Sequence, residues 1–180
     1  DFLAEVAHVQ GMADTAPIPI GIVGHVDLTA PELGALLDRM MAHGAFRGIR
    51  QILNLHADPM LTYVTQEYLA NPAWHRGFAE LGQRSLSFDL QLYPHQMAAA
   101  ASLATAHPDT PIILNHAGMW VDRTLAGWQQ WKAGLRMLAA CPNISVKISG
   151  LGMLDLHPTV ESLRPLVLET LEVFGVNRAM

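Results

Sequence analysis

Residues 111–149 read PIILNHAGMWVDRTLAGWQQWKAGLRMLAACPNISVKIS and contain a strand, a helix and a second strand in that order. Residues 111–116 and 144–149 are short apolar runs typical of buried strands. Between them, a helix over about 124–140 carries apolar side chains on one face, namely Leu125, Trp128, Leu135 and Leu138. Two strands joined by a crossover helix indicate a parallel pair.

The same alternation continues on both sides of this unit. Further apolar runs predict strands at 18–25, 48–53 and 86–92. Helices are predicted over 1–10, 31–43, 61–70, 72–83 and 94–106, and from Pro165 to residue 174, after which the chain resembles the entry to another strand. Five strands alternating with helices indicate one parallel sheet with right-handed crossovers.

Two architectures fit this alternation, an open doubly wound sheet and part of a (β/α)8 TIM barrel. No glycine-rich dinucleotide fingerprint follows any strand, which disfavours the doubly wound sheet. A complete barrel needs about 250 residues, whereas this chain has 180. We therefore expect residues 1–180 to form a single α/β domain, an incomplete TIM barrel of about five βα units that lacks its first strands and its last strand.

The composition excludes several classes of protein. Apolar residues make up 51% of the chain and charged residues 15%, which excludes a disordered segment. The net charge is −5 and no basic run occurs, so we expect no nucleic-acid partner, and the absence of an apolar stretch of about 18 residues predicts no membrane span. Cys141 is the one cysteine, which excludes an internal disulfide and fits a reducing, cytoplasmic compartment. We expect a small-molecule substrate, and formation of a homo-oligomer stays open.

Polar side chains occur at the end of every predicted strand. The candidate site residues are Arg50, His56, Asp89, Gln91, Asn115, His116 and Lys147, and the other polar residues in or just past the predicted strands are His25, Asp27, Gln51, Asn54 and Ser149. Chemistry in parallel α/β folds lies at the carboxyl ends of the strands. Because buried charge is costly unless it is paired or used, the pattern predicts a site at this edge of the sheet.

The candidates also have structural interpretations. His116 could be a hydrogen-bonded core histidine, although its place in residues 114–118, LNHAG, at a strand end favours function. Arg50 and Asp89 lie on neighbouring strands and could form a buried ion pair. Lys147 could extend its ammonium group to the barrel rim.

Several short motifs together resemble those of one family. They are residues 48–51 (GIRQ), 71–74 (NPAW) with 77–78 (GF), 87–91 (SFDLQ), 113–118 (ILNHAG) and 146–150 (VKISG). In this order they resemble the amidohydrolase-related family of the metal-dependent hydrolase superfamily. The branch is that of sugar lactonases similar to fuconolactonase and of 2-pyrone-4,6-dicarboxylate lactonase.

The resemblance implies a (β/α)8 barrel with a His-x-His motif on its first strand and an aspartate at the end of its last strand. Neither feature occurs in these 180 residues, so the resemblance implies a fragment. His116 matches the strand-end histidine of the family. Arg50, Asp89, Gln91 and Lys147 match positions that line the pocket in relatives.

By this resemblance, the complete protein would hydrolyse a lactone or similar cyclic ester of a sugar acid or aromatic catabolite, and the truncated chain would be inactive alone. The absent aspartate would activate water, and His116 would polarise the carbonyl or bind a divalent metal, zinc or manganese. Arg50 and Lys147 would hold a carboxylate or the oxyanion. Asp89, Gln91, His56 and Asn115 would bind or orient the substrate. Alternatives are a decarboxylase or amide hydrolase on the same barrel, and a truncated, non-catalytic binding fragment or pseudoenzyme.

Overall fold

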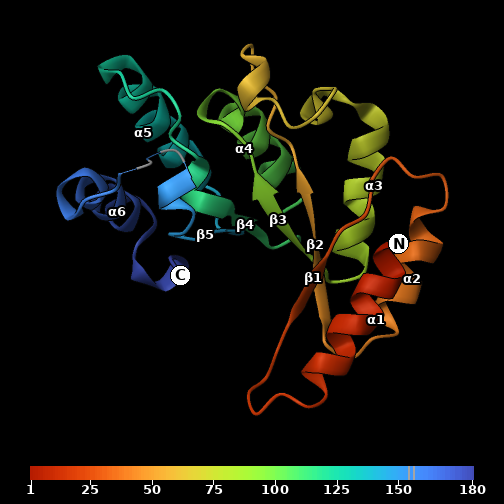
Figure 1. Cartoon of the computed structure of the whole chain (residues 1–180). Coiled ribbons are helices and arrows are strands. Elements are labelled where there is room, and N and C mark those ends of the chain that lie inside the picture. Colours follow the sequence, from red (N-terminus) through yellow and green to blue (C-terminus); the bar gives the residue numbers. More distant parts are fainter. Residues whose placement is uncertain (154, 156) are drawn as a thin grey trace.

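A parallel five-stranded sheet forms the centre of the molecule (Figure 1). The computed structural model describes residues 1–153, 155 and 157–180. The strands are β1 (Ile22–Gly24), β2 (Phe46–Ile52), β3 (Ser87–Gln91), β4 (Ile112–Leu114) and β5 (Ile144–Val146), and they pair in the order β1-β2-β3-β4-β5. The predicted α/β class and parallel sheet are therefore confirmed. A sheet in which each strand pairs with the next along the chain is the wall of a barrel, since a doubly wound sheet reverses its strand order near the middle.

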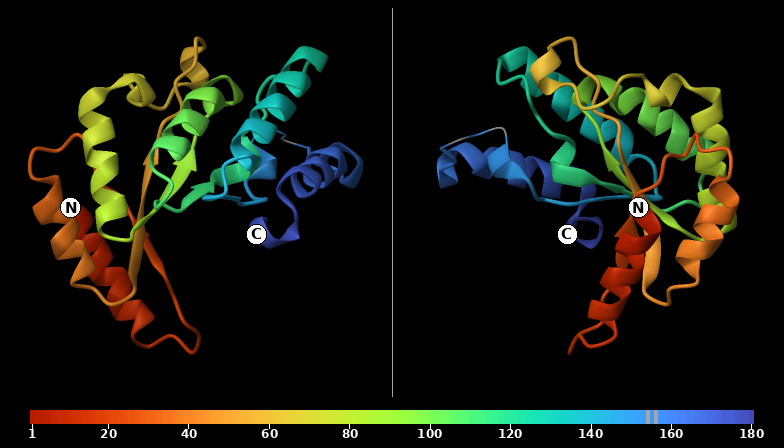
Figure 2. Two further views of the ribbon diagram at one scale, coloured as in Figure 1. Left: turned by 180° about the vertical axis from the view of Figure 1, so that it is seen from behind. Right: turned by 45° about the vertical axis from the view of Figure 1, so that its right-hand side comes forward.

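Helices follow the strands in alternation. They are α1 (Phe2–Ala13), α2 (Leu33–Met41), α3 (Pro72–Gln83), α4 (Met97–Ala106), α5 (Leu125–Ala139) and α6 (Val160–Phe174). Figure 2 shows α2, α3, α4 and α5 following one another along one side of the sheet. None of the described helices is both long enough and apolar enough to cross a lipid bilayer.

The core lies between the sheet and these helices. Alternate strand residues are fully buried there, among them Ile49, Phe88, Leu90, Leu114, Ile144 and Val146. The Phe88 ring lies 5.7 Å from that of Trp74 and 5.2 Å from that of Phe78, both on α3. Each large apolar side chain buried in this way contributes roughly 1.5–3 kcal/mol. Because strand side chains alternate between faces, the intervening residues Arg50 and Asp89 point to the side of the sheet away from the helices.

The two edges of the sheet lie beside the two ends of the described chain. Figure 1 shows α1 next to β1, and the C-terminal residues next to β5. There Ala179 forms a parallel bridge with Val146, and the backbone N–H of Met180 donates to the Val146 carbonyl at 2.9 Å. The extended segment predicted after the last helix is therefore confirmed.

The helix predicted over 61–70 is wrong. The chain instead forms two short 3-10 helices, η1 (Pro59–Leu61) and η2 (Tyr68–Ala70), with non-helical backbone between them. The Asp58 carboxylate accepts a hydrogen bond from the backbone N–H of Met60 at 2.9 Å. Such local bonds compete with continuous helix formation, so this segment is a loop at the end of β2.

Other element boundaries also differ from the prediction. The run over 18–25 is a strand only over Ile22–Gly24, since Pro19 has no N–H for the sheet. The last helix begins at Val160, so Pro165 lies inside it. The runs over 111–116 and 144–149 end as strands at Leu114 and Val146, which places their polar ends in the segments just beyond the strands.

Candidate active site

Arg50 and Asp89 stand side by side at the carboxyl ends of β2 and β3. The two residues are paired in the sheet register, and Gln91 pairs with Ile52 two positions further on. Since side chains alternate along a strand, Arg50, Asp89 and Gln91 share one face. The Arg50 guanidinium donates a hydrogen bond to the side-chain oxygen of Gln91. Gln91 therefore holds the cation in place without neutralising it.

Lys147 is the charged partner of Asp89. Its Nζ lies 2.5 Å from Oδ2 of Asp89, which is buried, whereas the Lys147 side chain is 35% exposed. The ion pair that the sequence allowed between Arg50 and Asp89 does not occur in the described structure, because Lys147, just beyond β5, occupies the carboxylate. The ammonium group of Lys147 is thus held by Asp89 and does not extend unpaired to the barrel rim.

His116 lies in a left-handed turn beyond the end of β4, and we call residues 115–119 the His116 turn. The backbone angles φ and ψ are 56° and 36° at His116, 49° and 30° at Ala117, and 47° and 65° at Met119. This conformation costs a non-glycine residue roughly 1–2 kcal/mol. Strained backbone persists only where its surroundings hold it, and such positions cluster at functional sites.

The ring of His116 is fixed by the chain that follows β5. Its Nδ1 forms a hydrogen bond with Oγ of Ser149 at 3.1 Å. Gly150 packs against the same ring so closely that an added Cβ would lie 2.4 Å from Nδ1, and its φ of +63° also favours glycine. These contacts leave the other ring nitrogen, Nε2, for a ligand.

Burial and charge keep the His116 imidazole neutral. Burial is the largest cause that lowers its pKa below the ordinary histidine value, and the nearby cations of Arg50 and Lys147 lower it further. The carboxylate of Asp89 and a hydrogen bond with the backbone of Ser149 act in the opposite direction but are weaker. A neutral imidazole at neutral pH can polarise a carbonyl, exchange a proton or bind a metal ion.

Four buried side-chain atoms of the described residues have no hydrogen-bond partner, and two of them belong to candidate site residues. These two are Nε of Arg50 and Oδ1 of Asn115, a donor and an acceptor. Buried polar groups are normally paired with protein or water, so each exception needs an explanation. Both lie at the carboxyl edge of the sheet, where a polar ligand would satisfy them.

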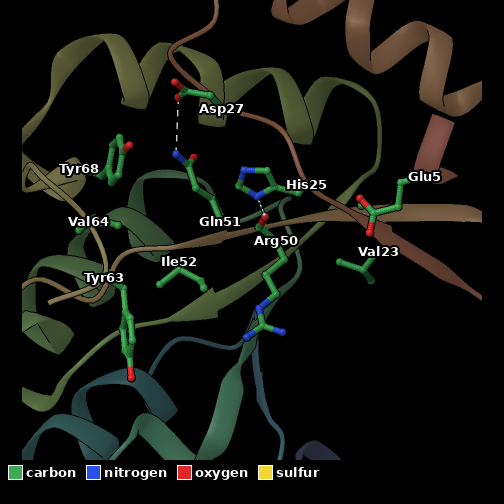
Figure 3. A pocket seen from close by; sticks show the side chains of 11 residues that line it. Glu5, Val23, His25, Asp27, Arg50, Gln51, Ile52, Tyr63, Val64 and Tyr68 are labelled. Atoms are coloured by element: carbon green, nitrogen blue, oxygen red, sulfur yellow. Dashed lines mark hydrogen bonds between the residues drawn. The ribbon is translucent and has the colours of Figure 1, made fainter. Parts of the chain in front are cut away.

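A cavity of about 520 Å³ opens beside Arg50, at the ends of β1 and β2. It is lined by Glu5, Val23, Gly24, His25, Asp27, Arg50, Gln51, Ile52, Tyr63, Val64 and Tyr68. Nδ1 of His25 lies 2.9 Å from the Arg50 carbonyl oxygen. Figure 3 shows the Arg50 guanidinium and the Tyr63 hydroxyl extending to one side of β2, and Gln51 and Asp27 to the other. The cavity therefore gives a small molecule access to Arg50.

Tyr63 and Tyr68 were missed from the sequence because their segment was predicted to be a helix. The Asp58-Pro59 pair, a turn signal directly after a strand, was the sign that a loop reaches the site here. Tyr93 anchors this loop, since its hydroxyl donates to the Leu61 carbonyl at 2.7 Å. Burial raises the pKa of Tyr93 to about 12, so the hydroxyl stays protonated and keeps donating.

His56 lies apart from the other candidates. Its Nδ1 accepts a hydrogen bond from the backbone N–H of Asp58 at 2.9 Å, and its ring lies 5.5 Å from that of Tyr93 and 5.8 Å from that of His95. In the part of the chain that the structure describes, no hydrogen bond joins it to Arg50 or His116. His56 shapes the loop after β2 here, and its substrate-binding role stays a prediction.

The described residues alone do not form a metal site. Within residues 1–153, 155 and 157–180, no group of three or more histidine, cysteine, aspartate or glutamate side chains could hold a metal ion. His116 offers one ring nitrogen, and the carboxylate of Asp89 is already paired with Lys147. The chain therefore supplies at most part of a ligand set.

Comparison with known proteins gives one family and several relatives. A family model described as Amidohydrolase matches residues 3–180. The uncharacterized protein y4mH of Sinorhizobium fredii is 47% identical over 177 residues, which cover 98% of this chain and 59% of that protein. An L-fucono-1,5-lactonase of Burkholderia ambifaria is 25% identical over 176 residues, which cover 97% of this chain and 58% of the lactonase.

A solved structure shares the fold. The crystal structure of an amidohydrolase from Burkholderia multivorans with bound zinc is similar, with a TM-score of 0.80 and 26% sequence identity, over 98% of this chain and 62% of that one. The chain thus spans about three fifths of the length of these relatives. Its five-stranded sheet corresponds to part of their barrel.

Proposed function

Because the chain belongs to the amidohydrolase family, we propose that the protein, in its complete form, hydrolyses a lactone or similar cyclic ester of a sugar acid or aromatic catabolite. The family match confirms the resemblance seen in the sequence motifs. A lactonase among the relatives supports the choice of substrate class. The single observation that carries the proposal is a half-buried histidine, its pKa lowered towards the neutral form, held beside two cations at the carboxyl ends of the strands.

The roles follow from the contacts. His116 presents Nε2 to the substrate carbonyl, since Nδ1 is engaged by Ser149. Arg50 and Lys147 place positive charge where a tetrahedral oxyanion or a substrate carboxylate would lie. Asp89 fixes Lys147, and Gln91 fixes Arg50, so both cations are oriented before substrate binds.

The base and the metal are the parts of the proposal that rest on the family alone. We propose that a carboxylate outside these 180 residues activates the water. A relative binds zinc, and His116 is the ligand that this chain would contribute. The metal would polarise the substrate carbonyl or lower the pKa of a bound water. The described residues do not complete the ligand set of such a metal.

His116→Ala tests the proposal in the protein expressed from its complete coding region. We expect kcat/KM for lactone hydrolysis, followed by acid release, to fall by about 10²–10³-fold, with little change in melting temperature. His8→Ala, which changes an exposed histidine on α1, is the matched control and should leave both values unchanged. An equal loss of folded protein and of activity would support a structural role for His116. Release of carbon dioxide in place of acid would indicate a decarboxylase instead.

A further inference from the structure

The His116 turn needs an external support. His116, Ala117 and Met119 all have left-handed backbone, and Gly118 between them has a φ of +73°. Side chains with a Cβ atom disfavour this conformation, so the turn would relax if nothing held it. Any relaxation would move the imidazole that the turn carries.

Both polar groups of the Ala117 backbone are held by neighbouring elements. Its N–H donates to the Lys147 carbonyl at 2.9 Å, which ties the turn to the end of β5. Its carbonyl accepts from Nε1 of Trp131 at 2.7 Å, which ties the turn to α5. Trp131 is fully buried, and its bond to Ala117 is also buried.

Trp131 has an aromatic neighbour on the same helix that makes no such bond. Trp128, also on α5, has its ring centre 4.8 Å from that of Trp131. It is only half-buried, and its indole N–H donates to no described residue. A change at Trp128 therefore serves as a control for disturbance of the aromatic contact that the two rings share.

We propose that Trp131 is a positioning residue, whose indole N–H holds the Ala117 carbonyl and so fixes the left-handed turn that presents His116. Ser149 orients the imidazole ring, whereas Trp131 orients the backbone that bears it. The consequence for catalysis rests on the proposed function. The consequence for the turn does not, and it can be measured without substrate.

Trp131→Phe, compared with Trp128→Phe, tests the support of the turn. Phenylalanine keeps an aromatic ring but cannot donate to the Ala117 carbonyl, and a buried carbonyl left unpaired is costly. We expect amide hydrogen exchange at Ala117 to become about tenfold faster in Trp131→Phe and to stay unchanged in Trp128→Phe. Equal exchange rates in the two variants would overturn the proposal.

A second replacement avoids the risk that a buried phenylalanine disturbs folding. Benzothienylalanine at position 131 keeps the bicyclic shape and replaces only the N–H group by sulfur. We expect it to accelerate Ala117 exchange by a similar factor while the melting temperature stays close to that of the unmodified protein. Unchanged exchange with this replacement would overturn the proposal, even if Trp131→Phe unfolds.

Activity provides the third measurement. With lactone as substrate, we expect kcat to fall about tenfold with KM within twofold in Trp131→Phe, and neither to change in Trp128→Phe. If the substitution only unfolded part of the protein, the folded fraction would fall, and kcat per folded molecule would stay unchanged. If the unmodified protein hydrolyses no lactone, the proposed function fails, while the exchange rates still decide the role of Trp131.

Discussion

Lys147 connects the charge of Asp89 with the protonation of His116. Its ammonium group neutralises the buried carboxylate and lowers the pKa of the imidazole at the same time. A substitution at either end of the ion pair therefore changes the histidine as well. Single substitutions at Asp89 or Lys147 therefore test the environment of His116.

Asp89→Asn should destabilise the protein more than the loss of a surface ion pair. Removing one partner of a fully buried pair costs about 3–5 kcal/mol. Because Lys147 is partly exposed and can turn to water, we expect about 1–3 kcal/mol from the free energy of unfolding in urea. Asp38→Asn is the control, since Asp38 is exposed where it pairs with Arg84, and we expect about 0–1 kcal/mol for it. Equal costs for the two variants would show that the Asp89 pair behaves as a surface pair.

The lowered pKa of His116 predicts the pH dependence of activity. If neutral His116 is required, the acid limb of kcat/KM lies below the ordinary histidine value of 6.5. Lys147→Met removes a cation that lowers this pKa, so the acid limb should move to higher pH. Lys132→Met, whose lysine pairs with Glu169, should leave the limb in place. A limb that stays or moves to lower pH in Lys147→Met would contradict this role of Lys147.

The lowered pKa of His116 also makes the free energy of unfolding depend on pH. The unfolded chain takes up a proton on this histidine at a higher pH than the folded chain does. The folded state is therefore favoured above the ordinary histidine pKa, and this contribution is lost as the pH falls through the lowered value.

Among the helices, α6 begins where a pair of local hydrogen bonds caps it, although it contains a proline further along. Ser162 N–H donates to Oγ1 of Thr159 at 3.1 Å, and Thr159 N–H donates to Oγ of Ser162 at 3.0 Å. This capping box starts the helix at Val160. Proline is best tolerated in the first turn, which is why Pro165 had predicted a later start.

Thr159→Ala should weaken this helix start. Loss of the cap is expected to lower the free energy of unfolding by about 0.5–2 kcal/mol, measured in urea. Thr159→Ser keeps the hydroxyl and should remain within about 0.5 kcal/mol of the unsubstituted protein. If Thr159→Ala unfolds at the same urea concentration as Thr159→Ser, Pro165 and the packing of α6 set the helix start instead.

At the scale of the molecule, the sequence predicted the five strands and their alternation with helices because these depend on local apolar periodicity. It also predicted that Arg50, Asp89, His116 and Lys147 belong to one edge, since parallel strands share their carboxyl ends. The structure brings these residues together, as the influence of all three charged residues on the His116 pKa indicates.

Which of these side chains contact one another at the carboxyl edge of the sheet could not be predicted from the sequence. Asp89 and Lys147 are 58 residues apart, and β3, which bears Asp89, does not pair directly with β5, which precedes Lys147, so their contact depends on the curvature of the sheet. Asn115 and His116 were predicted as strand residues, since the left-handed turn that contains them makes distant contacts, with Trp131 and Lys147, that apolar periodicity does not record. A helix is predicted over 61–70 from apolar periodicity, in which side-chain hydrogen bonds such as that of Asp58 leave little trace.

The alternation of side chains along the strands also has an evolutionary consequence. Ile49 and Phe88 pack under the helices, while their immediate neighbours Arg50 and Asp89 face the site. A mutant library confined to every second strand residue would sample new substrate preferences and leave the packing layer untouched. In such a sheet, substrate range can change over generations while the apolar packing layer is inherited unaltered.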